Sequence, residues 1–150
     1  MIYLILYQAI GILAIYMIFR IGTNLWFHLK VKRNCNINTK SGIKVQSNGE
    51  KRIANWLYDR NIQFIYDKPL YGVLLGGYRP DFRIKRSRGK DIIIEYWGRM
   101  DLKKYRIKRR KKKKFYMKKG FILISIEPHQ KVEKILWDSF KMFYYRNNNS

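Results

Sequence analysis

At 150 residues, the chain is long enough for one domain of ordinary size and an additional segment. It carries 33 Lys and Arg residues against 10 Asp and Glu residues, a formal net charge of +23. Such an excess favours a polyanionic partner, either a nucleic acid or an anionic membrane surface. With one cysteine, Cys35, the sequence excludes an intramolecular disulfide framework and a cysteine-based zinc cluster.

The N-terminal stretch is the most apolar part of the chain. Residues 2–19 are almost continuously apolar, and the stretch can be extended to residue 29, which suits a bilayer core of about 30 Å. A cleaved signal peptide would need a basic start, a shorter apolar core and a small-residue cleavage site, and these features are absent from the stretch. The alternative is a buried core helix, but the remaining residues leave little room to surround one on all sides. We therefore predict a transmembrane anchor over residues 1–29.

The charges that flank this stretch predict its orientation. Positive charge follows it at Arg20, Lys30, Lys32 and Arg33, whereas residues 2–19 carry none. By the positive-inside rule, the C-terminal part faces the cytoplasm or an organellar interior. The predicted localisation is a membrane, with a single pass.

A polar linker and a capped helix follow. Residues 30–46 show no apolar periodicity and are predicted to be a linker, followed by a domain over residues 47–146 and a tail over residues 147–150. Ser47 or Asn48 can cap a helix over residues 49–61. Glu50 lies on the face of this helix that turns towards the core. It is either a paired carboxylate that supports a metal site or an acid that stabilises the first helical turn.

Two carboxylates lie at the ends of a predicted β-hairpin. Asp81 starts one strand and Glu95 ends the next, with a Gly-containing turn between them. Either acid alone is more simply a turn residue or a solvent-facing strand residue. Together they place two hard oxygen ligands at one end of a small sheet, which suits Mg²⁺ or Mn²⁺.

A strongly basic helix is predicted over residues 101–119. Tyr105, Lys112 and Tyr116 are seven and four positions apart, so they share one helical face. Lys112 therefore points towards the core, unlike Lys111 and Lys113. The alternative is that Lys112 is one more solvated lysine of a basic run.

Further patterns complete an α/β fold. Residues 121–126 predict a buried strand, and the apolar spacing after Pro128 predicts a closing amphipathic helix. Helix, strand, hairpin, helix, strand and helix predict a mixed sheet flanked by helices, preceded by the transmembrane helix.

The order of these motifs resembles the PD-(D/E)xK nuclease superfamily, which has the restriction-endonuclease-like fold. The resemblance covers roughly residues 47–128. It rests on Glu50 in the first helix, Pro80 with Asp81, and Glu95 in a strand that ends as EYWG. A helix with a tyrosine and then a lysine follows this strand, as in small members of the superfamily.

The resemblance implies metal-dependent hydrolysis of phosphodiester bonds. Asp81 and Glu95 would hold Mg²⁺ or Mn²⁺, and Glu50 would support the site. The superfamily's lysine stands two positions after the glutamate, where this chain has Trp97. Some members supply the lysine from the following helix, which would assign the catalytic role to Lys112.

The basic run predicts a polyanion-binding surface. Side chains of such a run bind phosphates without sequence specificity, through counterion release. We expect nucleic acid, DNA rather than RNA, although anionic lipid competes for the same charge. The predicted binding residues are Lys108, Arg109, Arg110, Lys111, Lys113 and Lys114.

Three functions remain open on the sequence. The first is a membrane-anchored nuclease. The second is an inactive nuclease-like fold that binds nucleic acid or serves as an assembly subunit of a larger complex, for example an organellar one. The third is a membrane-assembly subunit whose basic face binds lipid headgroups.

Overall fold

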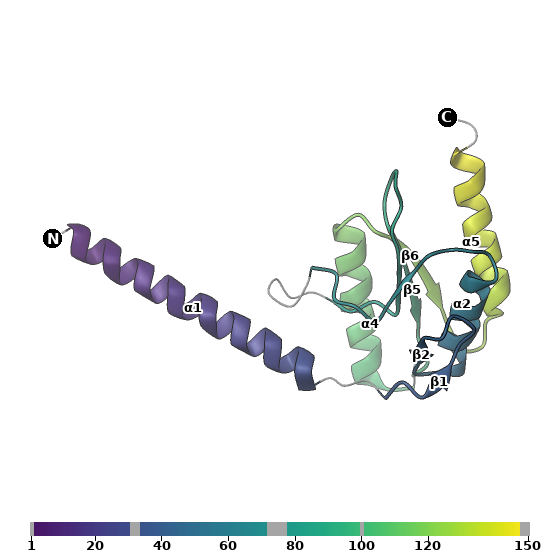
Figure 1. Ribbon diagram of the computed structural model, residues 1–150, viewed down its shortest axis with the longest axis horizontal. Helices are drawn as coiled ribbons and strands as arrows, with labels where there is room; N and C mark the ends of the chain where they lie inside the picture. The colour runs from purple at the N-terminus through teal and green to yellow at the C-terminus, as the bar shows by residue number, and fades with distance from the viewer. Residues whose placement is uncertain (1, 31–33, 72–77, 100, 148–150) are drawn as a thin grey trace. The chain divides into compact units, whose positions relative to one another are not determined.

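A computed structural model describes residues 2–30, 34–71, 78–99 and 101–147 (Figure 1). Its contacts divide the chain into two units: residues 1–33 with 69–78, and residues 34–68 with 79–150. In the first unit, α1 (Ile2–Lys30) is one continuous helix. Its segment Leu6–Thr23 is 0% buried, and by length and composition this helix could cross a membrane.

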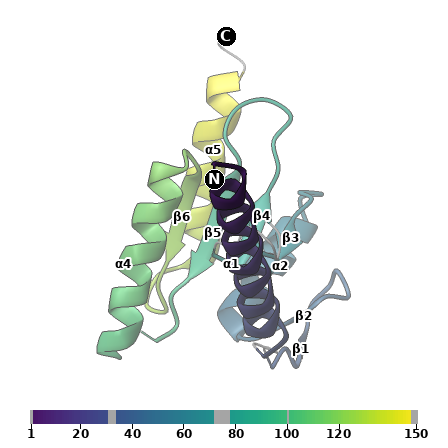
Figure 2. The same ribbon diagram turned by 90° about the vertical axis from the view of Figure 1, so that its left-hand side faces the viewer.

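The second unit is built on a four-stranded sheet of β3 (Ile65–Tyr66), β4 (Phe82–Ile84), β5 (Ile92–Tyr96) and β6 (Ile122–Ile126). The strands lie side by side in that order (Figure 2). The two pairings of β4, with β3 and with β5, are antiparallel, and β5 pairs with β6 in parallel. The predicted mixed sheet is confirmed.

One face of the sheet carries the hydrophobic core. Helices α2 (Asn48–Tyr58) and α5 (Val132–Asn147) cover it (Figure 1). Alternate residues of each strand point to this face, as the two-residue period of a strand requires. The core includes Ile53, Trp56, Leu57, Phe82, Ile84, Ile92, Ile94, Ile124, Ile126, Val132, Leu136 and Phe140.

Helix α4 (Lys103–Lys118) lies on the other side of the sheet (Figure 1). Only Lys112 and Tyr116 of this helix are buried. Gly120 has φ +75°, a conformation that glycine adopts readily, and it redirects the chain from α4 into β6. The α/β arrangement with helices on both faces is therefore as predicted.

The region predicted as a linker contains regular structure instead. Strands β1 (Ile37–Asn38) and β2 (Lys44–Val45) form a short antiparallel hairpin. The hairpin is attached to α2, because Lys40 donates its backbone N–H to Asn55 Oδ1 at 2.9 Å and pairs with Asp59. These long-range contacts stabilise a segment whose own sequence shows no strand periodicity.

Candidate functional site

The two hairpin carboxylates lie on the same face of the sheet. Phe82 pairs with Ile94, so the antiparallel register places Asp81 opposite Glu95, on the face that α4 covers. Both acids are buried, with 6% and 2% of their surface exposed. Asp81 Oδ2 also accepts a hydrogen bond from the backbone N–H of Tyr96 at 2.8 Å, which fixes it against β5.

Lys112 reaches Glu95 from α4. Its Nζ donates to Glu95 Oε1 at 2.6 Å and to Oε2 at 2.8 Å, and Tyr116 donates its hydroxyl to Oε1 at 2.6 Å. Lys112 is 4% exposed, whereas Lys111 is exposed and Lys113 is half-buried. The prediction that Lys112 differs from its neighbours and turns inward is confirmed, although it faces the side of the sheet that bears Glu95 and not the hydrophobic core.

The surroundings of Glu95 favour its protonated form. Burial, followed by the negative charge of Asp81, raises its pKa to about 7 from an ordinary value of 4.5. Lys112 and the Tyr116 hydroxyl oppose this shift by stabilising the carboxylate. The site therefore contains two acids that repel each other, with one ammonium between the sheet and α4 to offset them.

Trp97, two positions after Glu95, is a packing residue. It is buried, and its indole N–H donates to Ser125 Oγ at 2.7 Å. The ring lies 5.7 Å from Lys112 Nζ and 5.4 Å from the guanidinium carbon of Arg109, within the range of cation–π attraction. The indole thus borders the ammonium that occupies the site.

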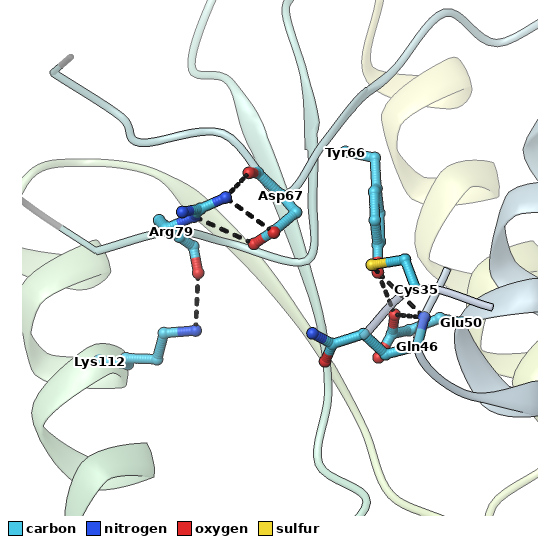
Figure 3. A network of polar contacts seen from close by, with 7 residues as sticks. All are labelled: Cys35, Gln46, Glu50, Tyr66, Asp67, Arg79 and Lys112. Atoms are coloured by element: carbon cyan, nitrogen blue, oxygen red, sulfur yellow. Dashed lines mark hydrogen bonds and ion pairs between the residues drawn. The ribbon is translucent and has the colours of Figure 1, made fainter. Parts of the chain in front are cut away.

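Glu50 belongs to a separate hydrogen-bond group beside the sheet (Figure 3). Its Oε2 accepts from the Tyr66 hydroxyl at 2.6 Å and from the backbone N–H of Gln46 at 3.1 Å, and its Oε1 accepts from Ser47 at 3.1 Å. Burial, and then the charge of Asp81, raise the pKa of Glu50. Glu50 is therefore close enough to Asp81 for their charges to interact.

A glycine brings α2 close to the hairpin. A Cβ atom added at Gly49 would lie 2.1 Å from the ring of Tyr96, so this ring packs directly against the helix backbone. Tyr96 is also the residue whose N–H holds Asp81. The first turn of α2, which bears Glu50, is thus fixed to the end of β5.

The two carboxylates have the ligand chemistry that a hard divalent cation prefers, but Glu95 is already largely occupied. Asp81 and Glu95 offer oxygen ligands, and a cation would relieve their repulsion. A carboxylate has about four acceptor positions, and Lys112 and Tyr116 use three of those on Glu95. Over the described residues, no group of three or more His, Cys, Asp or Glu side chains is arranged to hold a metal ion.

The predicted binding residues of α4 are not equivalent. Lys108, Arg110, Lys111 and Lys114 are exposed, whereas Lys113 is half-buried. Arg109 is also half-buried and forms an ion pair with Glu127. The exposed members give α4 a basic surface.

The sequence did not reveal the residues whose hydrogen bonds and ion pairs fix the predicted site residues in place. Asp67 and Arg79 form a partly buried ion pair beside Lys112, and Tyr66 holds Glu50. Asp67 follows a short apolar run and Arg79 precedes the Pro80–Asp81 pair, which is a weak signal. Asp67 and Arg79 are 12 positions apart and neither lies in a helix or strand, so their pairing cannot be predicted from periodicity.

Comparison with known proteins finds a distant relative of unknown role. An uncharacterized protein of Methanocaldococcus jannaschii is 30% identical over 104 residues, which cover 69% of this chain. The chain spans 9% of the length of that relative. No protein-family model matches the sequence, and no solved structure matches the fold.

Proposed function

We propose that this protein is a membrane-anchored, divalent-metal-dependent nuclease of the PD-(D/E)xK type that hydrolyses phosphodiester bonds of DNA. The proposal rests on one observation: Lys112 of α4 donates to both carboxylate oxygens of Glu95, on the sheet face that also bears Asp81. This is the neighbourhood in which the superfamily places its lysine, and here Trp97 occupies the usual strand position.

The residues have separable roles in the proposed reaction. Asp81 and Glu95 would hold Mg²⁺ or Mn²⁺, and Glu50 would support Asp81 through its charge. The ion supplies Lewis-acid polarisation of the phosphate and a more acidic bound water. Lys112 would orient the attacking water and stabilise the negative charge that develops on the phosphate oxygens.

The exposed side of α4 would hold the DNA backbone. Its cations would contact phosphates, which position the duplex without reading its sequence. Helix α1 would anchor the domain to a membrane, with the basic domain on the cytoplasmic or organellar side.

An inactive nuclease-like fold that binds nucleic acid is the second candidate. Lys112 has three donors, and Glu95 and the carbonyl of Arg79 accept all three. A purely structural ion pair would show the same saturation. In that case the basic surface of α4 would function alone.

A cleavage assay separates the two candidates. The full chain in micelles is given labelled duplex and single-stranded DNA and RNA, with Mg²⁺, Mn²⁺ or EDTA. The nuclease proposal expects cleavage that requires the metal and is lost in Asp81→Asn, but is kept in Asp101→Asn, which removes an exposed charge. Metal-independent binding without cleavage would favour the inactive fold.

A further inference from the structure

The ammonium of Lys112 has one acceptor outside the carboxylate pair. Besides Glu95, Nζ donates to the backbone carbonyl oxygen of Arg79 at 2.9 Å. An ammonium has three donors, so this carbonyl fixes the direction that Glu95 leaves open. The position of residue 79 therefore helps to set the position of the Lys112 ammonium.

Asp67 determines where residue 79 lies (Figure 3). The Arg79 guanidinium donates through Nε to Asp67 Oδ1 at 3.3 Å and through Nη2 to Oδ2 at 2.9 Å. Nη2 also donates to the backbone carbonyl of Asp67 at 2.8 Å. Asp67 in turn donates its own N–H to the carbonyl of Asp81 at 3.0 Å, so it holds the chain at residues 79 and 81.

The backbone of Asp67 is held in an uncommon conformation. Its φ is +46°, in the left-handed region that non-glycine residues rarely adopt, although Asp and Asn tolerate it best. Only 9% of Asp67 is exposed. A strained, buried acid persists where its contacts over-determine it, and such positions concentrate at functional sites.

We propose that Asp67 is a positioning residue for Lys112, acting through the side chain and the carbonyl of Arg79. The inference deepens the nuclease proposal and rests on it for its catalytic meaning. The carboxylate of Asp67 fixes Arg79, the carbonyl of Arg79 fixes the ammonium, and the ammonium lies on Glu95. Asp67 would thus act through Arg79 and not by contact with the substrate or the metal.

Whether the ammonium is held in its hydrogen bonds can be tested by NMR on the ¹⁵N-labelled full chain in micelles. A buried, fully hydrogen-bonded ammonium exchanges protons slowly and gives an N–H cross-peak, whereas exposed ammonium groups exchange too fast. We expect such a peak in the wild type, assigned to Lys112 by its loss in Lys112→Arg. It should broaden or vanish in Asp67→Ala and persist in Asp59→Ala, which breaks the exposed pair with Lys40.

Asp67→Asn guards against a variant that fails to fold. Asparagine tolerates the left-handed backbone and keeps the carbonyl contact with Arg79, but loses the charge. We expect a shifted, weakened peak in this variant. A missing peak in the wild type, or an unchanged one in both Asp67 variants, would overturn the inference.

Cleavage kinetics test whether the positioning of Lys112 by Asp67 matters for catalysis. We expect kcat to fall about 100-fold in Asp67→Ala with KM nearly unchanged, as for a misplaced catalytic group. A rise in KM alone would contradict positioning. If the wild type does not cleave but Asp67→Ala still disturbs the ammonium, the nuclease proposal fails while the structural link between Asp67 and Lys112 holds.

Discussion

Glu95 and Lys112 form an ion pair that is almost completely removed from water, with 2% and 6% of their side chains exposed. Burial of two charges is itself unfavourable, so such a pair does not add stability in proportion to its attraction. The raised pKa of Glu95 expresses this penalty. The charge of Glu95 can therefore be tested by changing the pH, and the charge of Lys112 by substitution.

We expect the metal-free protein to lose stability as the pH rises from about 4.5 to 7. The pKa of Glu95 in the folded state is about 7, above its ordinary value of 4.5, so the folded state binds more protons in this window. The free energy of unfolding then falls by at most about 1.4 kcal/mol per pH unit for one group. The raised pKa of Glu50 acts in the same direction.

Thermal unfolding in EDTA across this pH range measures the effect. Glu95→Gln is the matched control, because it keeps the shape but cannot ionise, and it should flatten the slope. A wild-type stability that rises with pH through this window, or an equal slope in Glu95→Gln, would contradict the assignment.

Lys112→Met should strongly reduce cleavage while leaving DNA binding nearly intact. The methionine keeps an unbranched, apolar chain but removes the ammonium, so we expect kcat to fall by two orders of magnitude or more, as when one charge-stabilising group is lost. The buried Glu95 would lose its partner, at a cost of up to about 3–5 kcal/mol in stability. Single-turnover cleavage and fluorescence anisotropy measure the two effects.

Lys111→Met is the control, since Lys111 is exposed on the same helix. It should slightly weaken DNA binding and leave the chemical step unchanged at saturation. Equal and small effects of the two substitutions would show that Lys112 is only part of the basic run, and the inactive fold would then be the better proposal.

At this scale, helical and strand periodicity predicted which side chains turn inward. The seven- and four-residue spacings placed Lys112 and Tyr116 on the buried face of α4. Asp67 could not be found this way, because its φ of +46° belongs to no regular element. Its partner, Arg79, is 12 positions along the chain.

At the scale of elements, one close contact joins α2 to β5. Gly49 allows the ring of Tyr96 to lie against the first turn of α2. Any side chain at position 49 must displace either the ring or the helix. Both alternatives move a residue that contacts a carboxylate of the site.

Gly49→Ala should therefore destabilise the fold, although alanine is the better helix former by about 1 kcal/mol. We expect a net loss of roughly 1–3 kcal/mol, the usual range for overpacking. Chemical denaturation gives the value. Asn48→Ala, at the exposed neighbouring position, serves as the control.

A second substitution shows whether the tyrosine ring is the cause. In Gly49→Ala with Tyr96→Ala, the added methyl group meets no ring, so the double variant should lose less stability than the sum of the single variants. Additive losses would mean that Gly49 is required for another reason.

Helices and strands were predicted correctly where apolar periodicity was strong. The prediction failed where long-range contacts, and not the local sequence, determine the structure. Helices α2, α4 and α5 and strands β4, β5 and β6 follow from their apolar patterns and caps, including the cap at Ser47. The β1–β2 hairpin has polar, irregular residues and depends on α2, so its sequence alone reads as a linker. Local propensity is a weak guide for such segments.

The whole molecule combines a strongly basic surface with an apolar helix, and each can be tested alone. The cations of α4 are not all available to a polyanion, since Lys112 and Arg109 form ion pairs with Glu95 and Glu127. The net charge of +23 alone would favour any polyanion. Removing charges from one defined surface is therefore more informative than changing the net charge of the whole protein.

Arg110→Gln with Lys114→Gln should weaken DNA binding equally for all DNA sequences. Each phosphate contact that is lost should lower the slope of log affinity against log salt by about 1. Lys131→Gln with Lys134→Gln removes the same charge near and on α5 and should change the slope little. Equal changes would mean that net charge acts without a defined surface, and binding of anionic vesicles in place of DNA would favour the lipid-binding subunit.

Helix α1 should hold the protein in a membrane. Its exposed apolar segment Leu6–Thr23 predicts that neither alkaline carbonate nor high salt extracts the chain from isolated membranes, whereas detergent does. Immunoblotting of the pellet and supernatant measures this. Release by carbonate would contradict an integral anchor and leave only attraction between the basic domain and anionic lipid.

The place of Lys112 in the chain has a consequence for biosynthesis. The two carboxylates belong to the β4–β5 hairpin, but the ammonium that offsets them arrives only with α4. While α4 is still inside the ribosome, the acids of the nascent hairpin lie on a sheet face that α4 does not yet cover and that the Lys112 ammonium does not yet neutralise. The pairing of β4 with β5 is therefore less stable at this stage. The site is thus completed in a single late step, and a translation product that stops before residue 112 contains both acids but no site.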